Sequence, residues 1–303
     1  MPILVTGAGG GVGSIGRRVV ERLGERGLPV RALVRREDER ADALRARGVE
    51  VVVADLTRAP DVVRALDGCR RVYFGMSVSP EYLEATATLA SAGRAAGNLE
   101  VVVSMSQMTV SQMDLTSTEE SRHQRLHWLA EQVLDWSGLP VTHVRPTIFM
   151  ENPLMTIFAY DSIARTGKIR LPFGAGRTSP VSAQDVADVV ATILAEPAGH
   201  VGRTYELTGP VSRDLSVMAE EFSAALGRPV VYEDVPFDEF AAELAAAQLP
   251  DHVLDHIRTM ARLHRANRYD RATSDVEKIL GRPATGVADY VTMNPELFRR
   301  QSL

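Results

Sequence analysis

The chain has 303 residues, of which 45% are hydrophobic and 24% are charged, and its formal net charge at pH 7 is -5. These values are those of a globular protein with about two domains, and the acidic balance disfavours nucleic acid or an anionic membrane as a partner. Cys69 is the only cysteine, so no internal disulfide can form. With no apolar run of about 18 residues, we expect a cytoplasmic protein without a membrane partner.

The first half of the chain alternates short apolar segments with segments rich in helix formers. Strands are expected at 3–5, 30–34, 50–54, 71–74 and 99–103. Helices are expected at 17–23, 38–47, 60–66 and 80–96. Apolar strands separated by helices imply a parallel sheet that is covered on both faces. The sequence therefore predicts an α/β fold with a doubly wound parallel sheet of the Rossmann type.

A glycine-rich loop connects the first strand to the first helix. Glycine lets the backbone approach a pyrophosphate closely, and a helix N-terminus offers free N–H groups and the positive end of its dipole. The pattern G-x-x-G-x-x-G occurs here in two registers, so a pyrophosphate would contact either Gly10 and Gly11 or Ser14 and Ile15. The residues predicted to bind a dinucleotide in this loop are Thr6, Gly7, Gly10, Gly11, Gly13, Ser14 and Ile15.

Two arginines follow the second strand, where an acidic residue would bind the ribose 2′-hydroxyl of NAD. The guanidinium groups of Arg35 and Arg36 suit a 2′-phosphate instead, and they predict NADP. Glu37 and Asp38 come next and keep NAD as an alternative. Two solvated arginines at a strand end are the simpler interpretation.

The ends of the next three strands supply the remaining candidates. Asp55 would accept a hydrogen bond from the adenine amino group, or it would cap the helix that follows. After the fifth strand, Ser104 would lie near the nicotinamide ribose and Ser106 would donate to a developing oxyanion, unless both satisfy backbone groups. In chain order these predicted contacts are Asp55, Leu56, Gly75, Met76, Ser77, Ser104 and Ser106.

Several of these segments resemble the NmrA-like family of atypical short-chain dehydrogenases. The resemblance rests on Thr-Gly-Ala at 6–8, Ala-Leu-Val-Arg at 32–35, Ala-Asp-Leu at 54–56 and, above all, SGLPVTHVRPTIFMEN at 137–152. It covers nearly the whole chain. It implies a Rossmann fold. The family contains NADPH-dependent quinone and azo reductases, isoflavone-reductase relatives, polyketide-tailoring enzymes and redox sensors. The glycine loop departs from the family's Thr-Gly-Ala-Thr-Gly-x-x-Gly because it is about one helical turn longer.

A second departure is the absence of the Tyr-x-x-x-Lys pair of related dehydrogenases, whose places are taken by His123 and His127. A capping-box pattern at 117–120 predicts a helix from there to about Trp136, with both imidazoles on one face. Either imidazole could pass a proton to a reduced oxygen, with His127 the first catalytic candidate. A solvated helix face is the alternative, and no metal is predicted because no third ligand is evident beyond Glu131.

The pattern changes after position 146. Helices are expected at 152–166 and 181–194, a turn at 174–177, strands at 205–209 and 229–235, and mostly helix from 215 onward. Methionine and aromatic residues at 149–160 would line a pocket for a flat substrate or pack as core. His252, His256 and His264 are predicted to face solvent, and the segment 237–263 has the amphipathic length of a lid or an oligomer contact.

These features predict a dinucleotide-binding Rossmann domain at 1–147 and a smaller, mostly helical substrate-binding region at 148–303, interleaved around 177–210. The predicted function is an NAD(P)H-dependent oxidoreductase that binds NADP and passes hydride to a flat, quinone-like or aromatic small molecule. The alternatives are a non-enzymatic NADP(H)-binding redox sensor and a tailoring oxygenase or isomerase of aromatic polyketide biosynthesis. The chain would be a monomer or a homodimer.

Overall fold

The computed structural model describes residues 1–10 and 12–299, and the chain divides into two compact units. The first unit comprises 1–113, 123–146 and 183–206, and the remaining segments form the second. Each unit is therefore assembled from segments that are far apart in the sequence. No helix within the described ranges is long and apolar enough to cross a membrane. The assignment of cofactor and substrate binding to separate parts of the chain stays a prediction.

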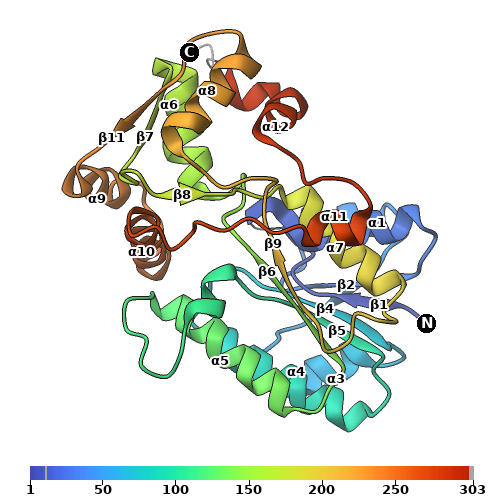
Figure 1. The fold of residues 1–303 in the computed structure, drawn as a ribbon. Coiled ribbons are helices and arrows are strands. Elements are labelled where there is room, and N and C mark those ends of the chain that lie inside the picture. Colours follow the sequence, from blue (N-terminus) through green and yellow to red (C-terminus); the bar gives the residue numbers. More distant parts are fainter. Residues whose placement is uncertain (11, 300–303) are drawn as a thin grey trace. The chain divides into compact units, whose positions relative to one another are not determined.

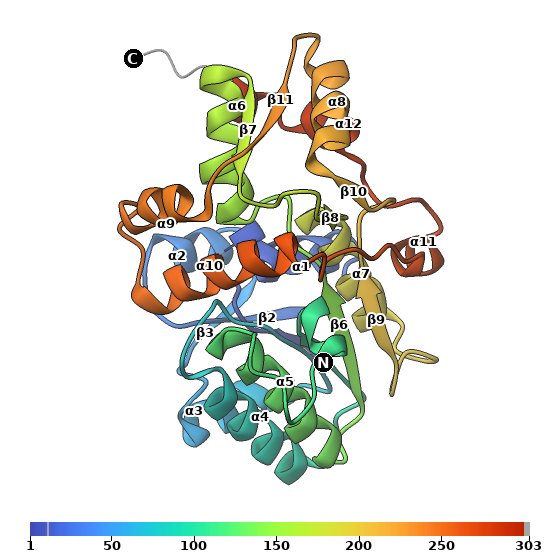
Figure 2. The same ribbon diagram turned by 60° about the vertical axis from the view of Figure 1, so that its left-hand side comes forward.

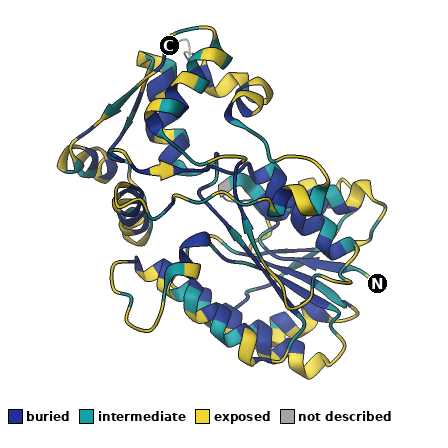
Figure 3. Cartoon of the chain, viewed as in Figure 1, coloured by how far each residue is buried: buried dark blue, intermediate teal, exposed yellow. Residues whose placement is uncertain are grey.

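A seven-stranded sheet forms the centre of the first unit, in the order β3-β2-β1-β4-β5-β6-β9 (Figure 1). The ladders from β3 to β6 are all parallel. Strands covered on both faces are buried, which is why the inner strands are rich in Val, Leu and Ile and why much of the sheet is dark blue in Figure 3. The predicted Rossmann fold is confirmed. The strands are β1 (Ile3–Val5), β2 (Val30–Val34), β3 (Glu50–Val53), β4 (Arg71–Phe74), β5 (Val101–Met105), β6 (Val141–Pro146) and β9 (Thr204–Leu207).

Helices cover both faces of this sheet (Figures 1 and 2). α3, α4 and α5 pack on one face through a shared apolar core, whereas α1 and α7 contact each other on the other face. The helices of this unit are α1 (Ile15–Glu25), α2 (Glu39–Arg45), α3 (Ala59–Leu66), α4 (Tyr82–Ala96), α5 (Arg122–Trp136) and α7 (Ala183–Ala195). Two short 3-10 helices, η1 (Val12–Ser14) and η2 (Met108–Gln112), lie in its loops.

Two predicted boundaries in the first unit differ from the structure, and one strand was not predicted. α5 begins at Arg122 rather than at 117–120, because the Asp114 carboxylate accepts hydrogen bonds from the backbone N–H and the hydroxyl of Thr116 and closes a turn there. β5 spans Val101–Met105, two residues later than expected. The segment 141–146 is strand β6, which the sequence analysis treated only as a motif.

The second unit contains two small sheets, an antiparallel pair β10–β8 and a parallel pair β11–β7. Helices pack on these pairs around a separate apolar core rich in Phe, Tyr and Met. The strands are β7 (Lys168–Leu171), β8 (Arg177–Thr178), β10 (Arg213–Asp214) and β11 (Val231–Asp234). The helices are the π-helix η3 (Leu154–Tyr160), α6 (Asp161–Thr166), α8 (Leu215–Leu226), α9 (Phe237–Ala245), α10 (Asp251–Arg265), α11 (Asp275–Leu280), α12 (Val287–Met293) and the 3-10 helix η4 (Pro295–Phe298).

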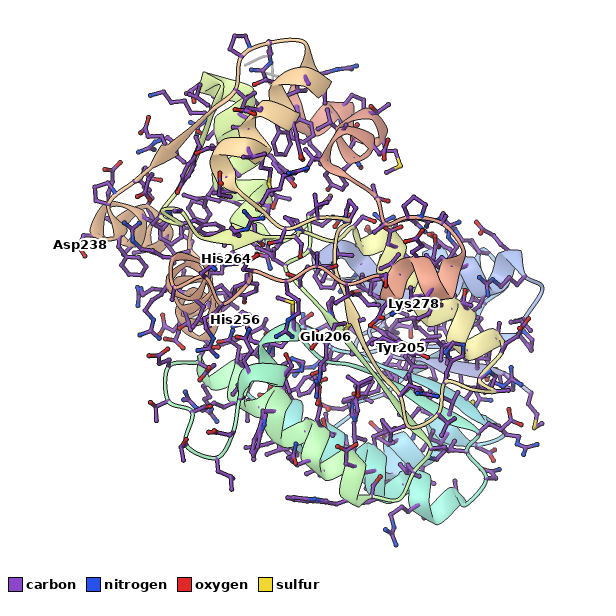
Figure 4. The ribbon with its side chains drawn as sticks, viewed as in Figure 1. Tyr205, Glu206, Asp238, His256, His264 and Lys278 are labelled. Carbon is purple, nitrogen blue, oxygen red and sulfur yellow. The ribbon has the colours of Figure 1, made fainter. Side chains whose placement is uncertain are left out.

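Two further predictions fail in this unit. The single helix expected at 152–166 is a π-helix followed by α6. The segment 237–263 contains α9 and most of α10, separated near Gln248, whose φ is +50°, and its role as a lid or an oligomer contact stays a prediction. His256 and His264, which Figure 4 labels on α10, are buried rather than exposed to solvent. The His264 ring stacks between the rings of Phe173 and Tyr269, whose centroids lie 4.1 Å and 3.7 Å from its own. Burial lowers the pKa of His264 to about 3 and that of His256 to about 4.

Candidate dinucleotide site

The ends of β1 and β4 are joined by the side chain of Thr6. Its Oγ1 accepts a hydrogen bond from the Gly75 N–H at 2.9 Å and donates one to the Gly75 carbonyl at 2.8 Å. Gly7 follows with φ of +66°, and a Cβ on it would lie 2.8 Å from that same carbonyl oxygen. Only glycine fits this position, which lies between the neighbouring strands where a doubly wound sheet binds dinucleotides.

The structure distinguishes the two registers of the glycine pattern. A Cβ on Gly16, the second residue of α1, would stand 2.6 Å from the carbonyl oxygens of both Thr6 and Gly7. Gly16 therefore allows α1 to pack closely on the end of β1, as a glycine does in dinucleotide-binding loops. This geometry favours the later register, in which the N–H groups of Ser14 and Ile15 lie at the start of α1, where an anion is stabilised.

The residues that lengthen the loop adopt backbone conformations outside the ordinary range. Gly10 and Gly13 have φ of +99° and +64°, and Ser14 has φ of +51°. Arg18 holds the loop in place, because its Nε donates to the Gly13 carbonyl at 2.9 Å and its guanidinium also bonds the side chain of Gln184 on α7 at 3.0 Å. The predicted contact Gly11 lies outside the described residues.

Of the four charged side chains that follow β2, the two acidic ones have hydrogen-bond or ion-pair partners in the described part of the protein and the two arginines do not. Glu37 forms an ion pair with Arg45, and the Asp38 carboxylate caps α2. Arg35 and Arg36 are exposed, and neither makes a hydrogen bond or ion pair with the described part of the chain. The two acidic groups are thus engaged by the protein, whereas both guanidinium groups are available to an external anion.

The carboxylate that follows β3 does not cap a helix. Asp55 Oδ1 accepts hydrogen bonds from the N–H of Thr57 at 2.9 Å and from its hydroxyl at 2.8 Å, and these bonds hold the pKa of Asp55 below its usual range. α3 begins at Ala59 with Arg58 in the capping position, so the predicted capping role of Asp55 is wrong. Leu56 is buried beside α3.

The segment after β4 is less constrained than the loop after β1. Met76 is partly buried and packs against the core under α3 and α4, whereas Ser77 is exposed. The described contacts give neither side chain a fixed role, and their contribution to cofactor binding stays a prediction.

Two serines extend along β5 and beyond its end. Ser104 and Ser106 are both buried, with 2% and 5% of their surfaces exposed. The N–H of Ser106 donates to the Val144 carbonyl at 2.8 Å, but its Oγ has no hydrogen-bond partner within the described ranges. The hydroxyl of Ser106 therefore does not satisfy a backbone group, contrary to the simpler interpretation.

The two histidines of α5 form a buried pair rather than a solvated face. Their Nε2 atoms lie 3.0 Å apart, and the exposed fractions are 8% for His123 and 6% for His127. One Nε2 must donate and the other accept, so the pair shares one proton across this contact. The interpretation of these residues as a solvated helix face is wrong.

The sequence analysis missed an aromatic residue beside this pair. The ring of Tyr82 on α4 lies 3.9 Å from the His127 ring, between centroids, and its hydroxyl donates to the Met105 carbonyl at 2.6 Å. Burial raises the pKa of Tyr82, which disfavours its ionisation. No local signal marks this residue, because only the sheet order brings the start of α4 to the end of β5 and to the first half of α5.

The buried carboxylate of Glu131 on α5 is held by an ion pair with half-buried Arg145. Arg145 binds both oxygens of Glu131, at 3.0 Å and 2.5 Å. Glu131 is therefore engaged by a cation and is not directed toward the histidine pair as a third metal ligand. Among residues 1–10 and 12–299, no group of three or more His, Cys, Asp or Glu side chains could hold a metal ion.

The comparison with known proteins agrees with a dinucleotide site. Residues 10–197 match a family described as NAD(P)H-binding. An NAD(P)H azoreductase of Xenophilus azovorans is 31% identical over 291 residues, which cover 95% of this chain and 97% of that protein. A (4-alkanoyl-5-oxo-2,5-dihydrofuran-3-yl)methyl phosphate reductase of Streptomyces griseus is 32% identical over 98% of this chain and 99% of that one. The solved structure of an NADPH-dependent quinone oxidoreductase from Escherichia coli, complexed with NADPH, superposes with a TM-score of 0.82 at 26% identity, covering 96% and 99% of the two chains.

Proposed function

Because this chain belongs to the NAD(P)H-binding family, we propose that it is an NADPH-dependent reductase of flat, electron-poor molecules such as quinones or azo compounds. The observation that carries the proposal is the loop after β1, where Gly7 and Gly16 allow close backbone approach and α1 presents its N-terminus. The similarity to reductases of azo compounds and quinones over nearly the whole chain supports the same reaction class. Within this family we infer the NmrA-like subtype, on the motif at 137–152.

The choice of NADPH over NADH rests on the charges after β2. Arg35 and Arg36 are free to bind a 2′-phosphate, and charge-assisted hydrogen bonds to phosphate are the stronger kind. Glu37 and Asp38, which would bind the 2′-hydroxyl of NADH, already have protein partners.

This preference has a direct test in cofactor binding. Replacing Arg35→Ala should weaken NADPH binding about 10-fold to 100-fold, as expected for a lost charged hydrogen bond, and leave NADH binding unchanged. The matched control is Arg47→Ala, which removes another exposed arginine of the same unit. Equal losses for NADPH and NADH would contradict the 2′-phosphate assignment.

In the proposed reaction the bound nicotinamide supplies a hydride, and a proton completes reduction of the acceptor: quinone, NADPH and one proton give hydroquinone and NADP+. Ser106 is the donor for the oxygen on which negative charge develops, since its hydroxyl is buried and has no protein partner in the described ranges. His127 or water supplies the proton, and His123 fixes the tautomer of His127 through the contact between their Nε2 atoms. Tyr82 packs on His127 and restricts the orientation of its ring.

The reductase proposal is tested by mixing the protein with NADPH and a panel of quinones and azo dyes and following the loss of nicotinamide absorbance. We expect turnover, and we expect Ser106→Ala to lower kcat by about 10²-fold, as is typical for loss of one oxyanion donor. Ser91→Ala, which removes an exposed serine of α4, is the control and should leave kcat unchanged. Tight NADPH binding without turnover on any acceptor would favour a redox sensor instead.

The other predictions concern the setting of this activity. We infer a cytoplasmic location, since Cys69 is the only cysteine and it is buried as a free thiol. Whether the chain is a monomer or a homodimer stays open to measurement by light scattering.

A further inference from the structure

The residue after Ser106 carries a second buried polar group without a protein partner. Gln107 continues β5 in extended conformation, with φ of −152° and ψ of 153°, and precedes η2. Its backbone carbonyl accepts a hydrogen bond from the N–H of Val110 at 3.2 Å. Its side-chain Nε2 is buried and has no hydrogen-bond partner in the part of the chain that the structure describes. A buried amide NH2 group that makes no hydrogen bond in the protein costs free energy and indicates an external partner.

The side chains of Ser106 and Gln107 point to opposite sides of the extended segment and so cannot bind the same group. Successive residues of an extended chain project to opposite faces, so Ser106 shares the face of Val102 and Ser104, where α4 and α5 pack. Gln107 shares the other face with Met105. The hydroxyl and the carboxamide therefore have separate roles.

The sheet order indicates which part of a dinucleotide reaches Gln107. The pyrophosphate belongs to the loop after β1, and the adenosine half extends toward β2 and β3, where Arg35 and Asp55 end those strands. The nicotinamide half must extend the other way, over β4 and β5. β5 is the second strand from β1 on that side, about 10 Å away at the usual strand spacing.

Nicotinamide carries a primary carboxamide, which offers one acceptor oxygen and one donor NH2 group. The side chain of Gln107 offers the same two groups, so the two amides can pair side by side through two hydrogen bonds. A quinone oxygen only accepts, and it would leave the Gln107 oxygen unpaired. The carboxamide of the cofactor is thus the better chemical match.

We propose that Gln107 is a positioning residue that binds the nicotinamide carboxamide and so fixes the orientation of the ring. This inference rests on the proposed cofactor, and it assigns to β5 a contact that determines which ring face is presented for hydride transfer. Ser106 remains directed to the acceptor.

The test is a double-mutant cycle in binding, which needs no turnover. Dissociation constants are measured by titration calorimetry for NADPH and for its 3-acetylpyridine analogue, in which a methyl group replaces the NH2. The natural protein should prefer NADPH by about tenfold, and Gln107→Leu should bind both molecules within about twofold of each other. Gln107→Met, which keeps the length of the side chain, should behave in the same way.

The control variant is Gln112→Leu on the same 3-10 helix, which should keep the tenfold preference. Retention of that preference by both variants of Gln107 would overturn the proposal. So would an effect confined to the KM of the quinone, since that would place the side chain on the acceptor. If neither NADPH nor NADH binds, the proposed function fails. If the binding cycle shows coupling between Gln107 and the carboxamide but no acceptor is reduced, the role of Gln107 is supported and only the proposed reductase activity is contradicted.

Discussion

The replacement Gly16→Ala tests the register of the cofactor loop. A Cβ at this position would lie 2.6 Å from the carbonyl oxygens of Thr6 and Gly7, and ordinary contact begins near 3.4 Å. Both oxygens are backbone atoms at the end of β1 and cannot rotate away. The N-terminus of α1 must therefore withdraw by about 0.8 Å, the difference of these two distances, from the loop that would hold the pyrophosphate.

The energetic cost follows from two opposing contributions. Overpacking typically costs about 1–3 kcal/mol, and contact with backbone on both sides places this case near 3 kcal/mol. Alanine gains about 1 kcal/mol over glycine in helix propensity, so the net loss in the free energy of unfolding is about 2 kcal/mol. For a domain of this size, such a loss lowers Tm by about 4–8 °C.

The matched control is Gly24→Ala in the same helix, where a Cβ would meet nothing within 4 Å. Here the helix propensity acts alone, and the variant should be more stable by about 0.5–1 kcal/mol. Both variants are compared by thermal unfolding and by NADPH titration. Only Gly16→Ala should lose cofactor affinity. Equal Tm values and equal NADPH affinities for Gly16→Ala and the natural protein would refute the helix–strand packing role.

Three further changes test buried and capping groups of the two units. Glu131→Gln leaves the half-buried Arg145 charge without its partner and should lower the free energy of unfolding by about 1.5–3 kcal/mol in chemical denaturation, the range for a hydrogen bond to a charged group. Glu25→Gln, at an exposed ion pair, should lower it by at most about 1 kcal/mol. Burial lowers the pKa of His264 to about 3, so between pH 6.5 and 3 this residue takes up a proton only in the unfolded chain, and stability is lost as the pH falls through this window. His264→Phe should therefore reduce the difference in unfolding free energy between pH 7 and pH 5 by about 2 kcal/mol. An unchanged difference would contradict this. Asp38→Ala removes the cap of α2 and should lower the free energy of unfolding by about 1 kcal/mol. The same substitution at an exposed residue that caps no helix should leave the free energy of unfolding unchanged.

Much of the first unit could be predicted from the sequence because the inner strands of its sheet are mostly buried. Such strands are continuous apolar runs, and β2 and β4 have the predicted bounds of 30–34 and 71–74. The glycine loop was recognisable for a similar reason, since a close backbone approach excludes every side chain. Its register was not, because the contact of Gly16 with the carbonyls of β1 depends on tertiary packing.

The second unit was harder to predict because its elements are short and its polar residues are buried in pairs. His256 accompanies Asp255 and Arg258 in the sequence and looks solvent-facing, yet its Nδ1 lies 2.9 Å from the Ser121 hydroxyl. Ser121 is 135 positions away along the chain, so no local pattern could identify this contact. The same holds for Tyr82 beside His127 in the first unit.

The loss of the Tyr-x-x-x-Lys pair changes what the site must obtain from other residues. In related dehydrogenases the lysine orients the nicotinamide ribose, and this chain has His127 at the corresponding place, in contact with His123 through Nε2. Because the Nε2 atoms of these two imidazoles are hydrogen-bonded to each other, the Nε2 of His127 is already engaged by the protein. Under our proposal the ring is oriented instead by Gln107, just past the end of β5, whose buried side-chain nitrogen has no hydrogen-bond partner in the described ranges. Under this proposal the histidine pair on α5 supplies the proton and Gln107, after β5, orients the nicotinamide ring. In the related enzymes one Tyr-x-x-x-Lys motif performs both tasks.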